Sequence, residues 1–349
     1  MRSEQLRTPF FCFSNWWNVK TRILRWLALA ILCISMSPTV RAGSLDANVI
    51  GMFPKNVAEF AYADLTEARK FSWYSQFKSQ SLPSRFSELE QFLNSSGVVP
   101  GLQIEELAWA VGSDDMDANS ESQSTPDGDY VVGVVLGSFD RASAEDTFKR
   151  RKLTGVEFQG FTLYPCAPAC ENLYITFIDS STIAFGRLAL LERLLIVRNG
   201  GDDSLVQNEH LFPLINQVNG RAIFWGVLNS PGARAAIQRL APAAAEFPQA
   251  RKLIQRVSAL LITVDGTSDL EAHLQVLSAS AEDSARLAQA VQMALFFRQF
   301  QESKSNPVFA GMLESVRVAS IGNSIDVSFS ASNDQITRLI EHNTFSTRR

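Results

Sequence analysis

The chain alternates short apolar runs, each the length of a β-strand, with segments in which apolar residues recur at helical spacing. Its longest apolar stretches after the N-terminal region, such as Val131–Leu136 and Ala259–Val264, are of strand size. Asp265-Gly266 lies between two such runs and is a strong hairpin signal, and Gly322-Asn323 separates another pair. Mixed strands, hairpins and helices predict an α+β fold in which helices cover antiparallel sheets.

This pattern places each expected element on the chain. Strands are expected at residues 57–63, 107–112, 130–137, 156–158, 162–164, 174–178, 183–185, 221–228, 257–264, 270–277, 316–321 and 325–329. Helices are expected after Asp64, from Pro83 to Gly97, and at 143–151, 188–195, 205–218, 232–245, 281–301 and after Asn333, with Asp64 and Asn333 as N-caps. The near-continuous apolar strand at 130–137 is expected to lie centrally in its sheet.

The two halves of the chain share this order of elements, which favours an internal duplication. The tetrapeptide Ser-Ala-Glu-Asp begins a helix in both halves, at residues 143–146 and 280–283. The order β-α-β-β-α-β resembles the split β-α-β, ferredoxin-like arrangement. The segment Asn199–Asp203 is the best candidate hinge between the halves. We therefore expect two tandem ferredoxin-like α+β lobes, at residues 43–200 and 201–349.

The first 42 residues have the features of a secretory signal peptide. Basic residues precede the apolar run Trp26–Ile34, and Val40-Arg41-Ala42 then provides a peptidase site. The run is short for a bilayer span, which needs about 20 apolar residues. Cleavage is expected after Ala42, giving an exported, periplasmic or secreted protein without a membrane span; an uncleaved signal anchor is the alternative.

The composition of the mature chain restricts its partners. Of 32 Lys and Arg and 36 Asp and Glu, residues 1–42 contain six bases and one acid, so 26 bases and 35 acids remain. This acidic balance argues against nucleic-acid binding and against docking on anionic lipid, because both need basic surfaces.

Two cysteines remain after cleavage, and their spacing predicts a disulfide. Cys166 and Cys170 flank a short loop that contains Pro168. In an oxidising compartment a close pair of this kind is read as a disulfide. A redox pair and a metal site are the alternatives, although a redox motif has two intervening residues and further metal ligands are absent nearby.

The segment at 114–129 is rich in acids and is expected to be a solvated loop. Asp115, Asp117, Asn119 and Glu121 alternate, as in calcium-binding loops. However, Ser120 stands where the EF-hand loop needs Gly, and Pro126 where it needs Glu. Calcium binding is therefore the weaker alternative.

Motifs for catalysis or cofactor binding are absent from the sequence. It contains neither a Gly-x-Ser-x-Gly elbow, nor His-Glu-x-x-His, nor a phosphate-binding loop. His210, His273 and His342 are expected to be surface residues, and His273 lies on the polar side of an alternating strand. We assign no catalytic, cofactor-binding or metal-binding residue and expect no cofactor.

Two acids and three tryptophans are compatible with a second functional class, a hydrolase that acts on sugars. Asp64 and Asp140 each follow an apolar strand at a helix start, where they are expected to act as N-caps, but such a pair could also line a hydrolytic cleft. Trp73, Trp109 and Trp225 could stack on sugars, although packing in the core is the commoner role.

The start of the mature chain resembles a family of exported proteins. Met52-Phe53-Pro54, followed by Phe60–Asp64, is similar to exported bacterial proteins of unknown function that consist of repeated α+β units behind a signal peptide. The resemblance implies export and carries no active-site residues. Together with the missing motifs, it favours a non-enzymatic module that binds an envelope protein or a small ligand; an envelope hydrolase that uses acidic residues is the alternative.

Overall fold

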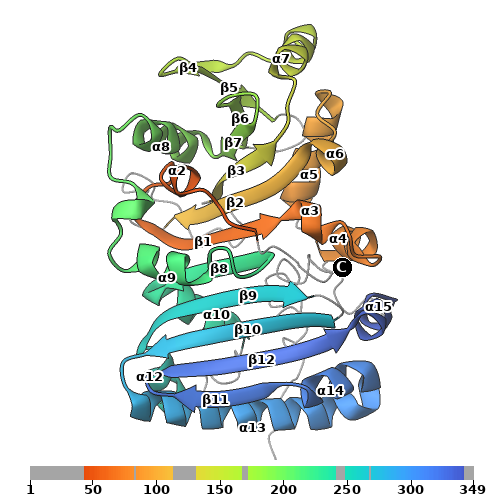
Figure 1. Cartoon of the computed structure of the whole chain (residues 1–349), viewed down its shortest axis with the longest axis vertical. Helices are drawn as coiled ribbons and strands as arrows, with labels where there is room; N and C mark the ends of the chain where they lie inside the picture. The colour runs from red at the N-terminus through yellow and green to blue at the C-terminus, as the bar shows by residue number, and fades with distance from the viewer. Residues whose placement is uncertain are drawn as a thin grey trace, which may run out of the picture.

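The computed structural model describes residues 43–81, 84–112, 131–166, 172–240, 248–266 and 269–341. Within these ranges the chain has the expected α+β fold, and twelve strands form one antiparallel sheet (Figure 1). The strands of the first half are β1 (Val57–Asp64), β2 (Ile104–Gly112), β3 (Val131–Gly137), β4 (Val156–Phe158), β5 (Phe161–Pro165), β6 (Tyr174–Phe177) and β7 (Thr182–Gly186). Those of the second half are β8 (Phe224–Asn229), β9 (Val257–Gly266), β10 (Asp269–Ser278), β11 (Arg317–Ile321) and β12 (Ser324–Ser332).

The two halves meet where β1 pairs with β8 in the middle of the sheet. The strands are antiparallel, with Ala61 opposite Gly226 and Tyr62 opposite Trp225. The Tyr62 ring stacks on the Trp225 indole with centroids 5.5 Å apart, and both side chains are 0 % exposed. The strand order is β11-β12-β10-β9-β8-β1-β2-β3-β7-β6-β5-β4, so the sheet runs without interruption from one half into the other.

Each half repeats the same strand order outward from this seam. The series β1-β2-β3-β7-β6 corresponds to β8-β9-β10-β12-β11, and β4 and β5 extend the first half. Local chemistry repeats as well: the Glu67 N–H donates to Asp64 Oδ1 at 2.9 Å, and the Gly232 N–H donates to Asn229 Oδ1 at 3.1 Å. Asp64 and Asn229 end the first strand of their halves, so each caps the helix that follows it.

The order within each half differs from the split β-α-β arrangement that the sequence suggested. There, strands joined by a helix are parallel, whereas β1 and β2, and likewise β8 and β9, are antiparallel neighbours. The shared tetrapeptide is also not in equivalent positions. Ser280 is the N-cap of its helix, whereas Ser143 lies inside a helix that Asp140 caps, so the matching residues are Asp140 and Ser280.

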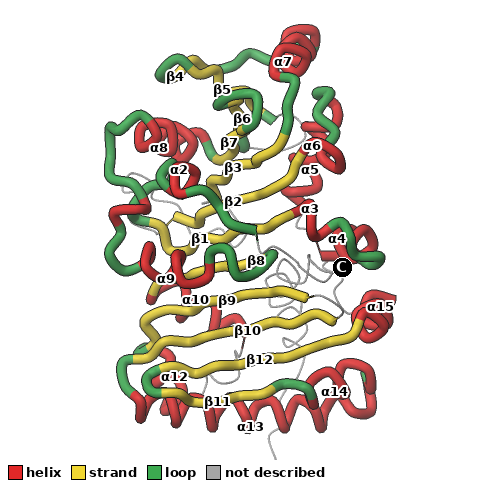
Figure 2. The backbone as a smooth tube through the Cα atoms, viewed as in Figure 1, coloured by secondary structure: helices red, strands yellow, loops and turns green. Residues whose placement is uncertain are grey.

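Most helices cover one face of the sheet (Figure 2). This face is covered by α3 (Leu65–Ala68), α4 (Tyr74–Ser81), α5 (Ser84–Ser95), α7 (Arg141–Arg150), α10 (Ser230–Leu240), α12 (Pro248–Ile254), α13 (Ala281–Ser305), α14 (Pro307–Glu314) and α15 (Asn333–Glu341), and α6 (Pro100–Gln103) leads into β2. In the described part of the chain, the opposite face is covered over the first half, the seam and part of β9, by α2 (Ala47–Ile50), α8 (Leu188–Arg198), the 3-10 turn η3 (Leu205–Gln207) and α9 (Leu211–Val218).

Several boundary predictions can be checked directly. β3 lies between β2 and β7, as its apolar sequence indicated, and the hairpins β9–β10 and β11–β12 are confirmed. The predicted turn at Asp265-Gly266 is wrong, because both residues belong to the end of β9 and pair with β10. Asn333 was wrongly assigned as the last N-cap, because the Ser332 hydroxyl accepts the Gln335 N–H at 3.2 Å. Asn333 instead accepts a hydrogen bond from the Trp73 indole at 2.9 Å.

The segment of the candidate hinge is bonded to the residues that precede β1. The Leu205 N–H donates to the Phe53 carbonyl at 2.8 Å, and the Lys55 ammonium pairs with the Asp203 carboxylate at 3.0 Å. Gly200 has a φ of +79°, which ends α8 at little steric cost. Within the described residues, no helix combines the length and the hydropathy that a membrane crossing would need.

The seam yields a first prediction. Replacing Trp225 with Ala removes a fully buried side chain and is expected to lower the free energy of unfolding by about 3–5 kcal/mol. Trp225→Phe should cost less, because the indole N–H is buried without a hydrogen-bond partner in the described structure. Urea unfolding followed by circular dichroism measures both, with Leu102→Ala, at an 82 % exposed position, as the control. Equal stability of Trp225→Ala and the unsubstituted chain would contradict the role of the seam.

Candidate functional site

A cluster of exposed apolar side chains lies on the outer side of α13. Four large apolar side chains are more than half exposed there: Met293 (61 %), Phe296 (66 %), Phe297 (59 %) and Phe300 (72 %). We call these four residues the α13 patch. Other large exposed apolar residues, such as Leu102 and Ile321, are separated from it in the fold and are of the scattered kind that monomeric surfaces tolerate.

The C-terminal half of α13 does not pack into the core. Leu287 and Ala288, near its beginning, are buried against β9 and β12 residues, whereas no residue from Gln289 to Gln301 is buried in the described structure. That stretch nevertheless contains Val291 and Leu295 on the inner side in addition to the α13 patch on the outer side. A helix that is apolar on both sides is normally enclosed by other elements, so this half of α13 has the sequence of a buried helix.

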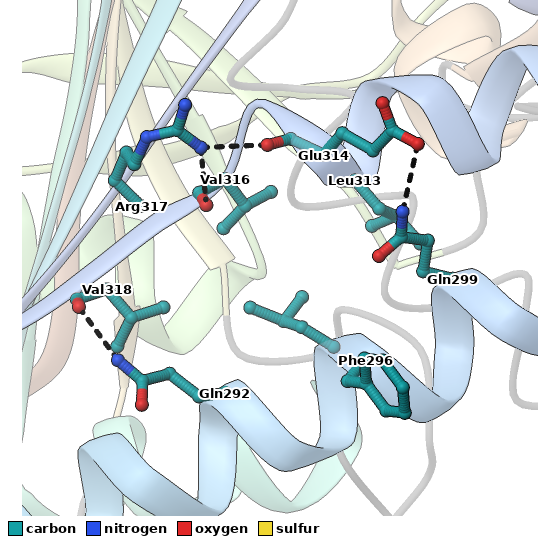
Figure 3. A pocket seen from close by; sticks show the side chains of 9 residues that line it. Gln292, Phe296, Gln299, Leu313, Glu314, Val316, Arg317 and Val318 are labelled. Atoms are coloured by element: carbon teal, nitrogen blue, oxygen red, sulfur yellow. Dashed lines mark hydrogen bonds between the residues drawn. The ribbon is translucent and has the colours of Figure 1, made fainter.

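A groove of about 330 Å³ lies beside the patch, between α13, the end of α14 and the start of β11 (Figure 3). Phe296, Leu313 and Val316 give it an apolar lining. Its polar side chains bond to one another or to the backbone: Gln299 Nε2 donates to Glu314 Oε1 at 3.0 Å, and Gln292 Nε2 donates to the Val318 carbonyl at 3.1 Å.

The remaining charge in the groove is also engaged. Arg317 Nη1 donates to the Glu314 carbonyl at 2.8 Å and to the Val316 carbonyl at 3.3 Å (Figure 3). These bonds hold the end of α14 against β11 and leave the apolar atoms as the surface that a partner would cover. The arrangement therefore supports apolar binding better than acid–base chemistry.

The acids singled out in the sequence act as helix caps. The Ser143 N–H donates to Asp140 Oδ1 at 3.0 Å, which matches the capping bond already described for Asp64. Both side chains lie at the end of the sheet where β1 and β3 finish, but neither lines the α13 groove. The capping interpretation of both acids is confirmed, and each carboxylate is engaged by backbone N–H groups.

Asp64 has an acidic neighbour that sequence reasoning missed. Glu106 on β2 lies directly opposite Asp64 on β1. Burial raises the pKa of Asp64, whereas the hydrogen bond from the Glu67 backbone N–H lowers it. Burial also raises the pKa of Glu106, and the nearby Asp64 charge adds to that rise, while an interaction with Tyr62 opposes it. Alternation along β2 could have shown that Glu106 shares a face with Ala108, but not that it meets Asp64.

The three tryptophans lie in the core, and the two described histidines lie on the surface, as the sequence predicted. Trp73, Trp109 and Trp225 are 3 %, 2 % and 0 % exposed, so they belong to the core and offer no sugar-stacking surface. His210 and His273 are exposed on the surface. His342 lies outside the described residues.

The disulfide and the calcium alternative stay as predictions. Cys166 is buried after β5, and Cys170 lies outside the described ranges, as does the acidic segment 114–129. Within the part of the chain that the structure describes, no three His, Cys, Asp or Glu side chains are grouped so that they could hold a metal ion.

The Asp64–Glu106 pair predicts that the stability of the fold falls as the pH rises. A carboxyl whose pKa is raised by folding binds its proton more tightly in the folded chain, so stability falls as pH rises from its ordinary pKa through the raised value. Glu106→Gln is therefore expected to raise the thermal midpoint relative to the unsubstituted chain at pH 7, and the difference should vanish near pH 3. Glu209→Gln, at an exposed position whose charge does not act on the pair, is the control. A lower midpoint for Glu106→Gln at pH 7 would contradict this sign.

Comparison with known proteins adds only a likeness of layout. The chain matches no family model and no curated protein. Among solved structures, crystal form I of TP0453 is 12 % identical over 86 % of this chain and 98 % of that chain, with a TM-score of 0.46. Crystal form III is 11 % identical over 86 % and 99 %, with a TM-score of 0.48, and crystal form IV is 12 % identical over 85 % and 97 %, with a TM-score of 0.42.

Proposed function

We propose that this protein is an exported, non-enzymatic binding module, and that its binding surface is the α13 patch with the adjoining groove. The observation that carries the proposal is the exposure of four large apolar side chains on one helix. Contiguous apolar surfaces of this kind on soluble proteins mark places where another molecule binds.

The spacing of the patch favours a helical partner. Met293, Phe296 and Phe300 follow one another at intervals of three and four residues, which is the spacing of a seam between two packed helices. Phe297 widens the same stripe. A partner helix with its own apolar stripe would place side chains between these rings, as amphipathic helices do in apolar recognition grooves.

A small ligand is less well supported as the occupant. Pockets for small molecules are concave and bury most of the ligand, whereas the patch lies on the outer side of a helix. The polar groups of the groove already bond to one another, so few remain to orient a polar ligand.

Hydrolysis has little support at this surface. Glu314 is the carboxylate that lines the groove, and Gln299 bonds to it. Asp64 and Asp140 belong to helix caps elsewhere in the fold. A binding role therefore fits the geometry better than the hydrolase alternative.

Export is part of the proposal and is supported by the N-terminal sequence. The basic region, the apolar run Trp26–Ile34 and the Val40-x-Ala42 site have the order that a signal peptidase recognises. An exported binding module would meet its partner in the envelope, and its acidic mature surface suits a protein that remains dissolved there.

The binding role can be tested with a designed probe. A fluorescein-labelled amphipathic helix of Leu, Ala and Glu residues is expected to bind the mature chain, as measured by fluorescence anisotropy. The double variant Phe297→Glu/Phe300→Glu should weaken binding at least about tenfold, because it removes two apolar contacts. Leu102→Glu, which adds the same charge at an exposed apolar site elsewhere, is the matched control. Failure of the unsubstituted chain to bind, or equal binding by the double variant, would argue against the proposal.

Cleavage of the signal is tested by mass. Expression of the full chain in a bacterium, followed by periplasmic extraction, is expected to yield a protein whose intact mass begins at Gly43. Ala42→Asp should block the cut, because the peptidase needs a small residue there. A protein of full-length mass in the cytosol would refute export.

A further inference from the structure

We infer that the partner of the α13 patch is a second copy of this chain, and that the two α13 helices pack antiparallel across a two-fold axis. The inference rests on the proposed function, since it assigns the occupant of the same surface. Two-fold dimers bury the same patch on both chains, so a single apolar patch is sufficient to build one.

The exposed apolar area matches what such a dimer needs. A Phe or Met side chain has an area of roughly 200 Å², and the four patch residues are about two-thirds exposed, so the patch offers on the order of 500 Å² per chain. Two copies would bury about 1,000 Å² in total, which is the size at which specific interfaces begin. Groove residues beside Phe296 would add to this area.

The spacing of the exposed residues along α13 allows a second α13 helix to pack against it. The exposed residues Arg286, Gln289, Met293, Phe296 and Phe300 recur at intervals of three and four. Lys304, four residues after Phe300, is also exposed, so the stripe continues on both sides of the apolar centre. A second α13 presents an identical stripe, and its rings would fill the spaces between the rings of the first.

The charges at the ends of α13 favour the antiparallel direction. Glu282 lies in the first turn with its side chain 73 % exposed, and Lys304 lies in the last turn. A parallel pair would put like charges together at each end, whereas an antiparallel pair centred on the patch sets Lys304 of one copy level with the uncharged Gln289 of the other. The helix dipoles also oppose one another favourably in that direction.

The oligomeric state of the mature chain tests the inference. Sedimentation velocity from about 1 to 100 µM is expected to show a monomer–dimer equilibrium. Phe297→Glu/Phe300→Glu should raise the dimer dissociation constant at least about tenfold, because it places four charges in the apolar centre of the dimer. Leu102→Glu and Ile321→Glu, which alter exposed apolar residues on α6 and on the edge strand β11, should leave the constant unchanged. Circular dichroism spectra of all variants should coincide.

The direction of packing is tested by cross-linking. Gln289 lies four residues before Met293 and Lys304 four residues after Phe300, so these two exposed positions are symmetric about the centre of the patch. A mixture of Gln289→Cys and Lys304→Cys chains should form a cross-linked dimer with a short bismaleimide more efficiently than either variant alone. Self-cross-linking of each single variant, at the same efficiency, would instead indicate a parallel pair.

Other occupants would appear as distinct results. A chain that stays monomeric at 100 µM overturns the inference. If that monomer still binds the designed helix, the proposed function stands and its partner is a different protein. If it binds neither copy nor helix but floats with phosphatidylcholine vesicles in a patch-dependent manner, both proposals fail and the surface is a lipid contact. Dimers that Ile321→Glu disrupts, but the patch variant does not, would also overturn the inference in favour of edge-strand pairing.

Discussion

The pairing of β1 with β8 is the constraint on which the rest of the structure depends. It converts two sets of strands into one sheet and places Tyr62 and Trp225 against each other at the centre. The rings of Phe53 and Phe60 pack beside them, with centroids 4.9 Å apart, so the segment before β1 is part of the same core. Neither half would cover its first strand edge alone, and an uncovered apolar edge invites aggregation.

The sequence was informative wherever a structure is fixed by neighbours along the chain. Alternating residues correctly predicted the hairpins β9–β10 and β11–β12, and the turn at Gly322-Asn323 was placed correctly, whereas Asp265-Gly266 is the paired end of β9. Helix caps at Asp64 and Asp140 were found for the same reason, since a cap bonds to residues three positions later. The cap at Ser332 was missed because Asn333 has an equally suitable side chain, which Trp73 takes up from a distant part of the chain.

Long-range contacts were beyond the reach of these patterns. No local signal in β1 or β8 shows that the two strands pair, and the Asp64–Glu106 juxtaposition depends on the register between β1 and β2. The α13 patch is a different case, because a signal was present. Met293, Phe296 and Phe297 lie beside inward-facing Val291 and Leu295, and this excess of apolar residues could have shown that α13 has more than one apolar side.

The two halves also differ in how their outer faces are covered, and this has a consequence for mutation. α8 packs on the face opposite α15, so β3 is apolar on a side where β10 is largely polar and α9 reaches it through the Gln217–Gln275 hydrogen bond, at 3.1 Å. By register, Val132 on β3 corresponds to His273 on β10, and Val134 corresponds to Gln275. Val132 and Val134 are buried, whereas His273 is exposed. Matching positions of one repeated layout should therefore drift at different rates: the first half is held by its covering helix, and the second is free to vary.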